Sequence, residues 1–278
     1  MSLPRFVAGK LAKSATRIIG THWGDSFPFY YVSEFPKSGG TWTARMIADY
    51  LQLPFPQHTI LPIGFSAVIQ NHWAYHPKFK RVFYAYRDGR DVIVSYFFDR
   101  LREARYSDRP VKQRVRRIYD KLLGKDYQSQ DIVRLLPKFM DFEYSKPGRG
   151  SRLNWRQHIE SWYDPDNRRH VAYFSYEQLL NDCAGTLGRA IQRITGEEID
   201  PWRIQTTVEK FSMVRQSGRT PGEEDLTQHI RKGVAGDWLN HFTRAAAEQF
   251  NDLAGDALVT LGYEQDRHWV DRYEYVTA

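Results

Sequence analysis

One short stretch constrains the fold of this chain more than any other: FYYVSEFPKSGGTW, residues 29–42. An apolar run typical of a strand leads into a proline, a lysine, a serine and two glycines, and apolar residues at helical spacing follow. A strand, a glycine turn and a helix start together form an anion site, because unpaired backbone N–H groups and the helix dipole point at one spot. The alternative is an ordinary β-α turn, but the lysine, the adjacent glycines and the nearby hydroxyls favour a phosphate-binding loop.

The lysine of this loop stands before its glycines. In the common phosphate-binding P-loop the lysine follows the last glycine, and the Ser or Thr after it binds Mg²⁺. Here Lys37 precedes Gly39 and Gly40, and the helix opens with TWTAR instead. Asp88 follows another apolar run and would suit a metal, but Arg87 beside it would place a cation at the metal position. We therefore expect a nucleotide bound without a metal.

Three further apolar runs are strand candidates: residues 67–72, 81–86 and 170–176. Strands that alternate with helical patterns indicate β-α-β units and a parallel sheet. We therefore expect the α/β class, as a single domain over residues 1–278 with a central parallel β-sheet flanked by helices and a P-loop-like loop.

Four polar side chains fall where the predicted strands end: Lys37, His72, Arg87 and Tyr176. Ligands of parallel sheets bind beyond the carboxyl ends of the strands. One sheet edge can therefore gather all four, which favours a single site.

A helix cap and two loops are predicted from short local signals. Asp91 is expected to cap a helix that starts at Val92, after the Asp-Gly turn signal. Residues 124–153 and 215–235 resemble loops, either as functional lids or as tolerated insertions.

Composition sets broad limits on the function. Apolar residues make up 41% and aromatic residues 15% of the 278 residues, which is typical of a globular protein. No apolar run approaches the roughly 20 residues needed to cross a bilayer. The single cysteine, Cys183, cannot form an internal disulfide, so we expect a reducing compartment, the cytoplasm. The formal net charge of +7 favours an anionic partner.

Two basic stretches leave alternatives open. Residues 100–117 are dense in arginine, and a solvated helix face is the more common interpretation of such a run. Residues 1–20 have apolar positions at helical spacing between basic residues. A basic amphipathic helix can lie on a membrane, so peripheral membrane contact stays an alternative to packing against the domain.

Three motifs carry a resemblance to a known family. PKSGGTW (36–42) resembles the 5′-phosphosulfate loop P-K-S-G-T-T-W of the cytosolic-type sulfotransferases, which use 3′-phosphoadenosine 5′-phosphosulfate (PAPS). RDGRDVIVSY (87–96) resembles the family's 3′-phosphate motif, and RKGVAGDWLNHFT (231–243) its C-terminal signature. The motifs follow the family's order and together span most of the chain.

The resemblance implies a role for each matching residue. It implies that Lys37 contacts the bridging oxygen and the leaving phosphate, and that His72 is the catalytic base. A lysine placed before the turn would stabilise negative charge only as it develops on the leaving phosphate. The resemblance implies that three further groups of residues bind PAPS. Ser38, Gly39, Gly40 and Thr41 would bind its 5′-phosphate, and Trp42 and Tyr176 would bind its adenine. The 3′-phosphate would be bound by Arg87, Ser95, Arg231, Lys232 and Gly233.

The chain also departs from the family's pattern. Gly40 stands where the family has the first threonine of the loop, and Gln70 stands where a lysine is frequent. Either Phe211 or Ser212 aligns with the adenine-side Ser/Thr. The family's dimer motif keeps only Thr243 and Glu248, so the oligomeric state stays open.

Other interpretations remain beside the sulfotransferase. His58, His76 and His158 also lie in plausible regions, and His158 matches a supporting W-x-x-H-x-x-x-W segment of the family. A nucleotide kinase on a related fold and a nonenzymatic anion-binding protein are the two alternative functions. The expected acceptor is a small-molecule, lipid-linked or carbohydrate hydroxyl or amine, and nucleic acid is not expected as a partner.

Overall fold

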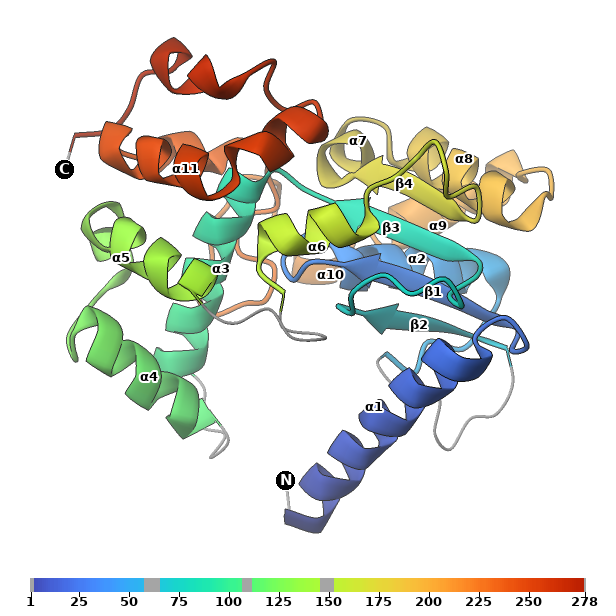
Figure 1. The fold of residues 1–278 in the computed structure, drawn as a ribbon. Helices are drawn as coiled ribbons and strands as arrows, with labels where there is room; N and C mark the ends of the chain where they lie inside the picture. Colours follow the sequence, from blue (N-terminus) through green and yellow to red (C-terminus); the bar gives the residue numbers. More distant parts are fainter. Residues whose placement is uncertain (1–2, 58–65, 107–111, 146–152, 278) are drawn as a thin grey trace. The chain divides into compact units, whose positions relative to one another are not determined.

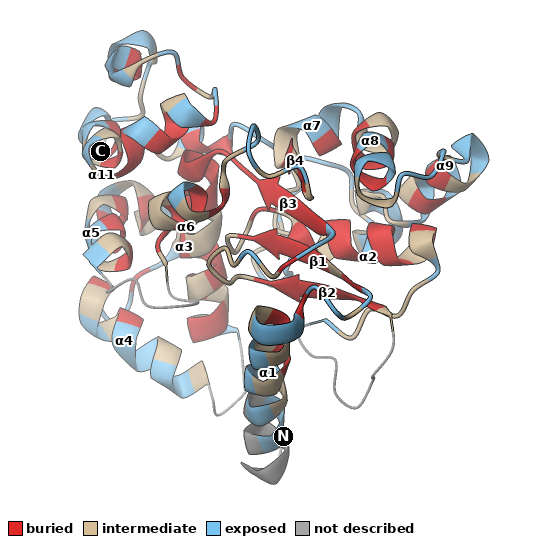
Figure 2. Cartoon of the chain, turned by 45° about the vertical axis from the view of Figure 1, so that its right-hand side comes forward, coloured by how far each residue is buried: buried red, intermediate tan, exposed pale blue. Residues whose placement is uncertain are grey.

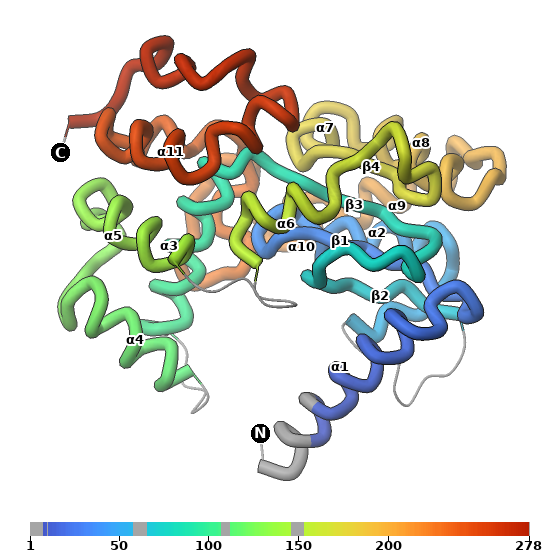
Figure 3. Tube along the Cα trace, in the orientation of Figure 1, coloured from blue at the N-terminus to red at the C-terminus, as the bar shows by residue number. Residues whose placement is uncertain are grey.

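The computed structural model describes residues 3–57, 66–106, 112–145 and 153–277. The chain groups into two compact units, which can be followed by colour in Figure 3. We call Met1–Arg87 with Ser161–Arg219 the sheet unit, and Asp88–Glu160 with Thr220–Ala278 the helical unit. The single domain over residues 1–278 stays a prediction.

The sheet unit is built on four parallel strands in the order β2-β1-β3-β4. Val32 of β1 pairs with Gln70 of β2 and with Phe83 of β3, and Ala85 of β3 pairs with Phe174 of β4. The predicted α/β class with a parallel sheet flanked by helices is thereby confirmed. The strands are β1 (Phe29–Glu34), β2 (Ala67–Asn71), β3 (Val82–Tyr86) and β4 (Val171–Ser175).

The strands are buried on both faces, as their red colour in Figure 2 shows. Three helices cover one face: α2 (Gly40–Leu51) packs on β1 and β2, α8 (Cys183–Thr195) packs on β3 and β4, and α9 (Pro201–Lys210) packs on both helices. The core on this face includes Val32, Val68, Phe83, Ile47 and Leu187. The sheet unit also contains α1 (Leu3–Trp23), α7 (Tyr176–Asn181) and α10 (Met213–Ser217) (Figure 1).

Aromatic residues fill the opposite face of the sheet. Trp162 is the last residue of α6 (Trp155–Trp162), and it is fully buried. Its ring stacks on Tyr84 with centroids 5.2 Å apart and on Phe79 with centroids 6.2 Å apart. Its Nε1 donates a hydrogen bond to the Trp73 carbonyl oxygen at 2.6 Å. Trp162 therefore joins β3 to the segment that follows β2.

The helical unit contains four long helices and short 3₁₀ turns within its described residues. The elements are α3 (Gly89–Arg105), α4 (Gln113–Leu123), η2 (Ser129–Asp131), α5 (Ile132–Ser145), η3 (Asp237–Asn240), α11 (Arg244–Thr260) and η4 (Arg267–Arg272), with most of α6. Contacts join α5 to α3, α4 and α11, and η3 to α3.

The predicted cap of α3 is wrong. The helix begins at Gly89, and the carboxylate of Asp88 accepts a hydrogen bond from the Arg90 backbone N–H at 2.8 Å. Asp91 lies within the first turn, and its buried carboxylate accepts from the backbone N–H groups of Gly236 at 2.8 Å and Trp238 at 3.0 Å. An Asp at either position satisfies the cap pattern, and only the tertiary contact decides between them.

The predicted loop over residues 124–153 is also wrong in its central part. Residues 132–145 form α5, because Ile132, Leu135, Leu136, Phe139 and Met140 share one buried face at helical spacing. Residues 146–152, with most of the SKPGRGS segment, lie outside the described residues. The second predicted loop is confirmed from residue 218 to residue 235, where no helix or strand forms after α10.

The basic stretch at residues 100–117 is only partly a solvated face. In its described part, Arg100 lies 2.6 Å from Asp99 and 2.6 Å from Glu103, and Arg105 lies 2.9 Å from Asp120. Lys112 also pairs with Glu103. These charges are therefore neutralised within the helical unit.

The predicted N-terminal helix is present as α1, in which Leu11, Ile18 and Trp23 are exposed. None of the helices in the described part of the chain is long and apolar enough to cross a membrane. Peripheral membrane contact and the cytoplasmic location stay predictions.

We predict that Trp162→Ala lowers the free energy of unfolding by about 3–5 kcal/mol, because it leaves a large cavity and an unpaired carbonyl. Chemical denaturation measures the change. Trp202→Ala is the matched control, since Trp202 is 76% exposed and its loss should cost less than about 0.5 kcal/mol. Equal losses in the two variants would contradict this account of the aromatic face.

Candidate functional site

The carboxyl edge of the sheet gathers the four predicted side chains. Lys37 follows β1 by three residues, while His72, Arg87 and Tyr176 come directly after β2, β3 and β4. Because the strands are parallel and adjacent, their ends meet at this one edge. The prediction that these residues share an edge is confirmed.

The loop between β1 and α2 turns through unusual backbone angles. Lys37 has φ +77° and Gly39 has φ +87°, both in the left-handed region that non-glycine residues rarely adopt. Within the described residues, the fully buried Ser38 hydroxyl has no hydrogen-bond partner. A buried hydroxyl without a partner is costly, so Ser38 is a candidate for contact with a ligand.

Gly39 is required by its surroundings as well as by its φ angle. A Cβ atom at this position would lie 2.8 Å from Cδ2 of Tyr176. The Arg87 guanidinium lies over the same tyrosine ring, 4.4 Å from its centroid, and donates a hydrogen bond to the Lys37 carbonyl oxygen at 3.2 Å. Arg87 and Tyr176 thus hold the loop from one side.

Trp42 lies in the first turn of α2 and is fixed by two neighbours. Its Nε1 donates to the Phe211 carbonyl oxygen at 2.8 Å, and its ring meets Tyr176 edge-on with centroids 6.1 Å apart. Ser212 instead caps α10, where its hydroxyl accepts from the Arg215 backbone N–H. Of the two aligned choices, Phe211 is the residue joined to Trp42.

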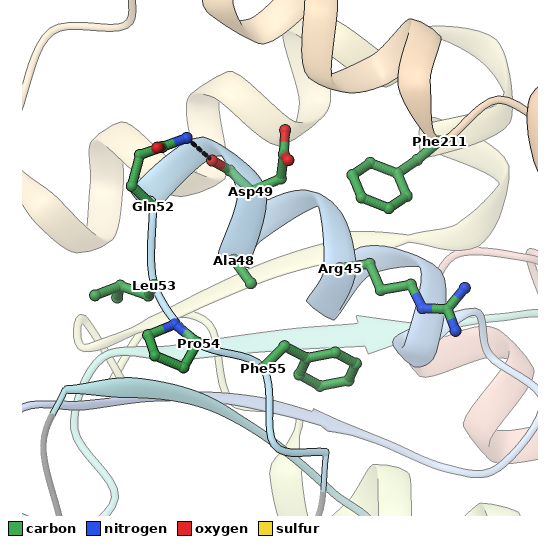
Figure 4. A pocket seen from close by; sticks show the side chains of 8 residues that line it. All are labelled: Arg45, Ala48, Asp49, Gln52, Leu53, Pro54, Phe55 and Phe211. Atoms are coloured by element: carbon green, nitrogen blue, oxygen red, sulfur yellow. Dashed lines mark hydrogen bonds between the residues drawn. The ribbon is translucent and has the colours of Figure 1, made fainter. Parts of the chain in front are cut away.

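An open groove runs along the exposed side of α2, one turn beyond Trp42 (Figure 4). Arg45 and the ring of Phe211 lie at one end of the view, and Leu53 and Pro54 lie where the chain leaves α2. The lining residues are Arg45, Ala48, Asp49, Gln52, Leu53, Pro54, Phe55 and Phe211. The groove adjoins the predicted adenine contacts through Phe211.

His72 is half-buried, and one of its nitrogens is oriented by the sheet. Nδ1 lies 3.0 Å from the backbone carbonyl oxygen of Glu34. A carbonyl oxygen only accepts hydrogen bonds, so Nδ1 carries the proton and Nε2 keeps its lone pair. Burial lowers the pKa of His72, against the hydrogen bond to Glu34, which raises it. The neutral imidazole is therefore the form present at neutral pH.

Glu34 is a site residue that the sequence analysis did not identify. It ends β1, it is buried, and its carboxylate accepts from the backbone N–H of Gly40 and from Nε2 of Gln70 at 2.7 Å. Gln70 in turn lies 2.9 Å from the Thr41 hydroxyl. An acidic residue at the end of a mostly apolar strand, six residues before an unusual glycine, was the available signal.

The helical unit holds residues 88–96 of the second motif and the whole of the third, while Arg87 belongs to the sheet unit. Arg231 lies over the ring of Phe98, 4.2 Å from its centroid, and Phe98 is one turn beyond Ser95 on α3. The loop folds back on itself, since the N–H of Asp225 donates to the Arg231 carbonyl and that of Gly222 to the Lys232 carbonyl, each at 2.9 Å. Gly233 has φ +68°.

Asp237 is a second residue that the sequence analysis did not single out. Its buried carboxylate accepts from Arg231, from Lys232 at 2.6 Å, and from Asn240 at 3.0 Å, and it lies 3.2 Å from Nε2 of His241. Burial opposes its ionisation, but hydrogen bonds from His241, Arg231 and Lys232 hold its pKa well below the usual range. Asp237 therefore keeps two cations together and in place.

His158 and His76 lie elsewhere, and His58 lies outside the described residues. His158 is buried in α6, and His76 packs edge-on against Phe79 with centroids 5.8 Å apart. Neither directly follows a strand. The residues that the structure describes include no group of three or more His, Cys, Asp and Glu side chains that could hold a metal ion.

We predict that Gly39→Ala lowers the free energy of unfolding by more than Gly196→Ala does, as measured by chemical denaturation. Both positions have positive φ, which costs an alanine about 1–2 kcal/mol, but a Cβ at Gly196 meets open space. Only the Cβ at Gly39 collides with Tyr176. Equal losses would mean that Tyr176 does not constrain the loop.

Comparison with known proteins identifies the family of this chain. A family model described as "Sulfotransferase domain" matches residues 68–262, a range that begins after the loop at 36–42. Mouse (Mus musculus) Sulfotransferase 2B1 is 24% identical over 278 residues, covering 93% of this chain and 71% of its own length. The 3-beta-hydroxysteroid sulfotransferase of Cavia porcellus is 30% identical over 108 residues, covering 36% of this chain and 38% of its own length.

A solved structure supports the fold. The crystal structure of mouse sulfotransferase SULT7A1 complexed with PAP is similar with a TM-score of 0.56 and 16% identity, and the match covers 94% of this chain and 96% of that one. The family model covers well over half of the chain. The chain therefore belongs to the sulfotransferase domain family of enzymes.

Proposed function

We propose that this chain transfers the sulfuryl group of PAPS to an acceptor hydroxyl, or to an amine, by in-line displacement. The observation that carries the proposal is the loop after β1, where the buried Ser38 hydroxyl lacks a partner among the described residues and Lys37 and His72 share one sheet edge. A phosphosulfate would supply the anionic acceptors that this loop requires. The resemblance of the three motifs points to the same donor.

The contacts to the nucleotide are proposed residue by residue from that resemblance. Ser38, Gly39, Gly40 and Thr41 bind the 5′-phosphate, and Trp42 and Tyr176 bind the adenine. Phe211 supports the tryptophan through the hydrogen bond to Nε1. Arg87, Ser95, Arg231, Lys232 and Gly233 bind the 3′-phosphate.

The reaction forms one bond and breaks another at sulfur. The acceptor oxygen attacks the sulfur, and the bond from sulfur to the oxygen that bridges it to the 5′-phosphate breaks. Nε2 of His72 takes the acceptor's proton, because Nδ1 already donates to Glu34. Lys37 stabilises the charge that develops on the bridging oxygen. The products are a sulfate ester and adenosine 3′,5′-bisphosphate.

The 3′-phosphate gives the proposed selectivity for PAPS over ATP. Asp237 holds Arg231 and Lys232 in place by hydrogen bonds. Each charge-assisted hydrogen bond from such cations contributes about 1.5–3 kcal/mol. A nucleotide without the 3′-phosphate would forfeit these contacts.

The acceptor is proposed only as a class. One relative's name assigns it a 3β-hydroxysteroid substrate, and this makes small hydroxylated molecules the first acceptors to screen. The arginines of residues 100–117 contribute little to an acidic acceptor, since most of those described are paired with carboxylates.

We predict that adenosine 3′,5′-bisphosphate binds without metal at least about 100-fold more tightly than ADP, since two or more charge-assisted hydrogen bonds separate them. Calorimetric titration of both ligands measures the difference, and Arg87→Ala should weaken binding of the bisphosphate. Equal affinities, or binding that requires Mg²⁺, would favour the kinase alternative.

We predict that Lys37→Ala and His72→Ala each reduce turnover of PAPS by about 100-fold or more, since one loses leaving-group stabilisation and the other the general base. The assay measures bisphosphate release with an acceptor found by screening hydroxysteroids and phenols. His76→Ala is the matched control and should keep nearly full turnover. Near-normal rates in the Lys37 and His72 variants would refute the mechanism.

A further inference from the structure

The carboxyl group of Glu34 lies directly beneath the phosphate loop. Glu34 is 2% exposed, and its two oxygens accept from the Gly40 backbone N–H and from Nε2 of Gln70. Gly40 is the first residue of α2, so its N–H is one of the donors that a helix start offers to an anion. The carboxylate therefore already occupies part of the positive end of this helix.

The carboxyl group also fills the space of a missing side chain. A Cβ atom at Gly40 would lie 2.0 Å from Cδ of Glu34 and 2.1 Å from its Oε1. Gly40 stands where the phosphosulfate loop P-K-S-G-T-T-W of the sulfotransferases has its first threonine. The glycine and the glutamate thus form one coupled feature, because no larger residue fits at position 40 while Glu34 keeps this position.

On the basis of the proposed function, we propose that Glu34 is a positioning residue of the phosphate loop that takes up a proton when the 5′-phosphate of the nucleotide binds. Two anions at one helix start repel each other, and little water separates them in a buried site. Protonation removes the negative charge of Glu34 and leaves the positive end of α2 to the phosphate.

The groups around Glu34 make this proton uptake feasible near neutral pH. Burial raises the pKa of Glu34 to about 7, against the hydrogen bonds of Gln70 and Gly40 and the charge of Lys37. His72 faces it as well, with Nδ1 3.9 Å from Oε1, and Tyr84 of β3 lies within electrostatic range. A bound phosphate adds negative charge and raises this pKa further.

The hydrogen-bond network can accommodate the protonated acid. The Gln70 amide bridges Glu34 and the Thr41 hydroxyl, at 2.7 Å and 2.9 Å from Nε2. With the amide turned by 180°, its oxygen accepts the new O–H of Glu34, and its nitrogen faces Thr41, whose hydroxyl can accept or donate. The other Glu34 oxygen then shares the Gly40 N–H with the 5′-phosphate, a three-centre arrangement that is common at helix termini. No buried polar group in the network loses its partner.

The sign of the pH dependence follows from linkage. The nucleotide-bound chain holds one proton more than the free chain, so affinity falls as pH rises through and above the pKa of Glu34. Between roughly pH 7.5 and 8.5 the affinity for adenosine 3′,5′-bisphosphate should fall by up to about tenfold per pH unit.

Calorimetry of the full chain with adenosine 3′,5′-bisphosphate tests the proposal. At roughly pH 8 the ligand's phosphates are already fully ionised, so a proton taken up enters the protein. Titrations in two buffers of different ionisation enthalpy should report uptake approaching one proton per nucleotide. In Glu34→Gln the amide mimics the protonated acid, so uptake should vanish and affinity should stay constant with pH. The exposed Glu198→Gln is the matched control and should behave as wild type.

A second variant keeps the test decisive if Glu34→Gln does not fold. Gln70→Lys places a permanent cation beside Glu34, which neutralises the carboxylate without a proton, so uptake should again disappear. Binding of the bisphosphate without proton uptake in the wild-type chain, or uptake that persists in either variant, would overturn the inference alone. Absence of binding at every pH would overturn the proposed function together with it.

Discussion

The site depends on a single backbone path, the turn that carries the chain from β1 into α2. Lys37 and Gly39 both adopt left-handed angles there, and a lysine bears such an angle only when its surroundings enforce it. Arg87 supplies part of that enforcement by binding the Lys37 carbonyl, and Tyr176 fills the space beside Gly39. Residues that follow two other strands, β3 and β4, therefore fix the turn that follows β1, and this works because the strands are parallel and share one carboxyl edge.

Beneath the turn, the residues that depart from the sulfotransferase motifs form one hydrogen-bonded network with Glu34. Gly40 makes room for the Glu34 carboxyl group, and Gln70 joins that group to Thr41. Considered separately, a lost hydroxyl and a missing lysine weaken the resemblance. Considered together, they belong to a loop in which the titratable carboxyl group of Glu34 fills the space of the side chain that Gly40 lacks. The backbone carbonyl of the same Glu34 also sets the tautomer of His72.

In the helical unit, aromatic rings and carboxylates stabilise a buried cation. Arg90 is buried between the rings of Trp238 and Trp269, and its guanidinium lies 2.5 Å from Glu264. Asp91, next to it, accepts from two backbone N–H groups of the segment that also carries Asp237. Buried charges of the second motif thus contact the third motif, Arg90 through the ring of Trp238 and Asp91 through two backbone N–H groups. A charge buried without such a partner would cost several kcal/mol.

The amino-acid pattern was enough to predict the α/β class and the four strands to within one or two residues. It also predicted that Lys37, His72, Arg87 and Tyr176 gather at one edge, because the carboxyl ends of parallel strands lie together. It did not determine α5, where an internal proline and neighbouring loop-like residues obscured the helical period. The choice of Asp88 over Asp91 as the cap of α3, and the position of Glu34 under Gly40, emerged from the tertiary structure. Asp91 is held by the distant backbone N–H groups of Gly236 and Trp238, and Glu34 meets Gly40 through the path of the turn after β1. Local residue spacing carries no information about such contacts.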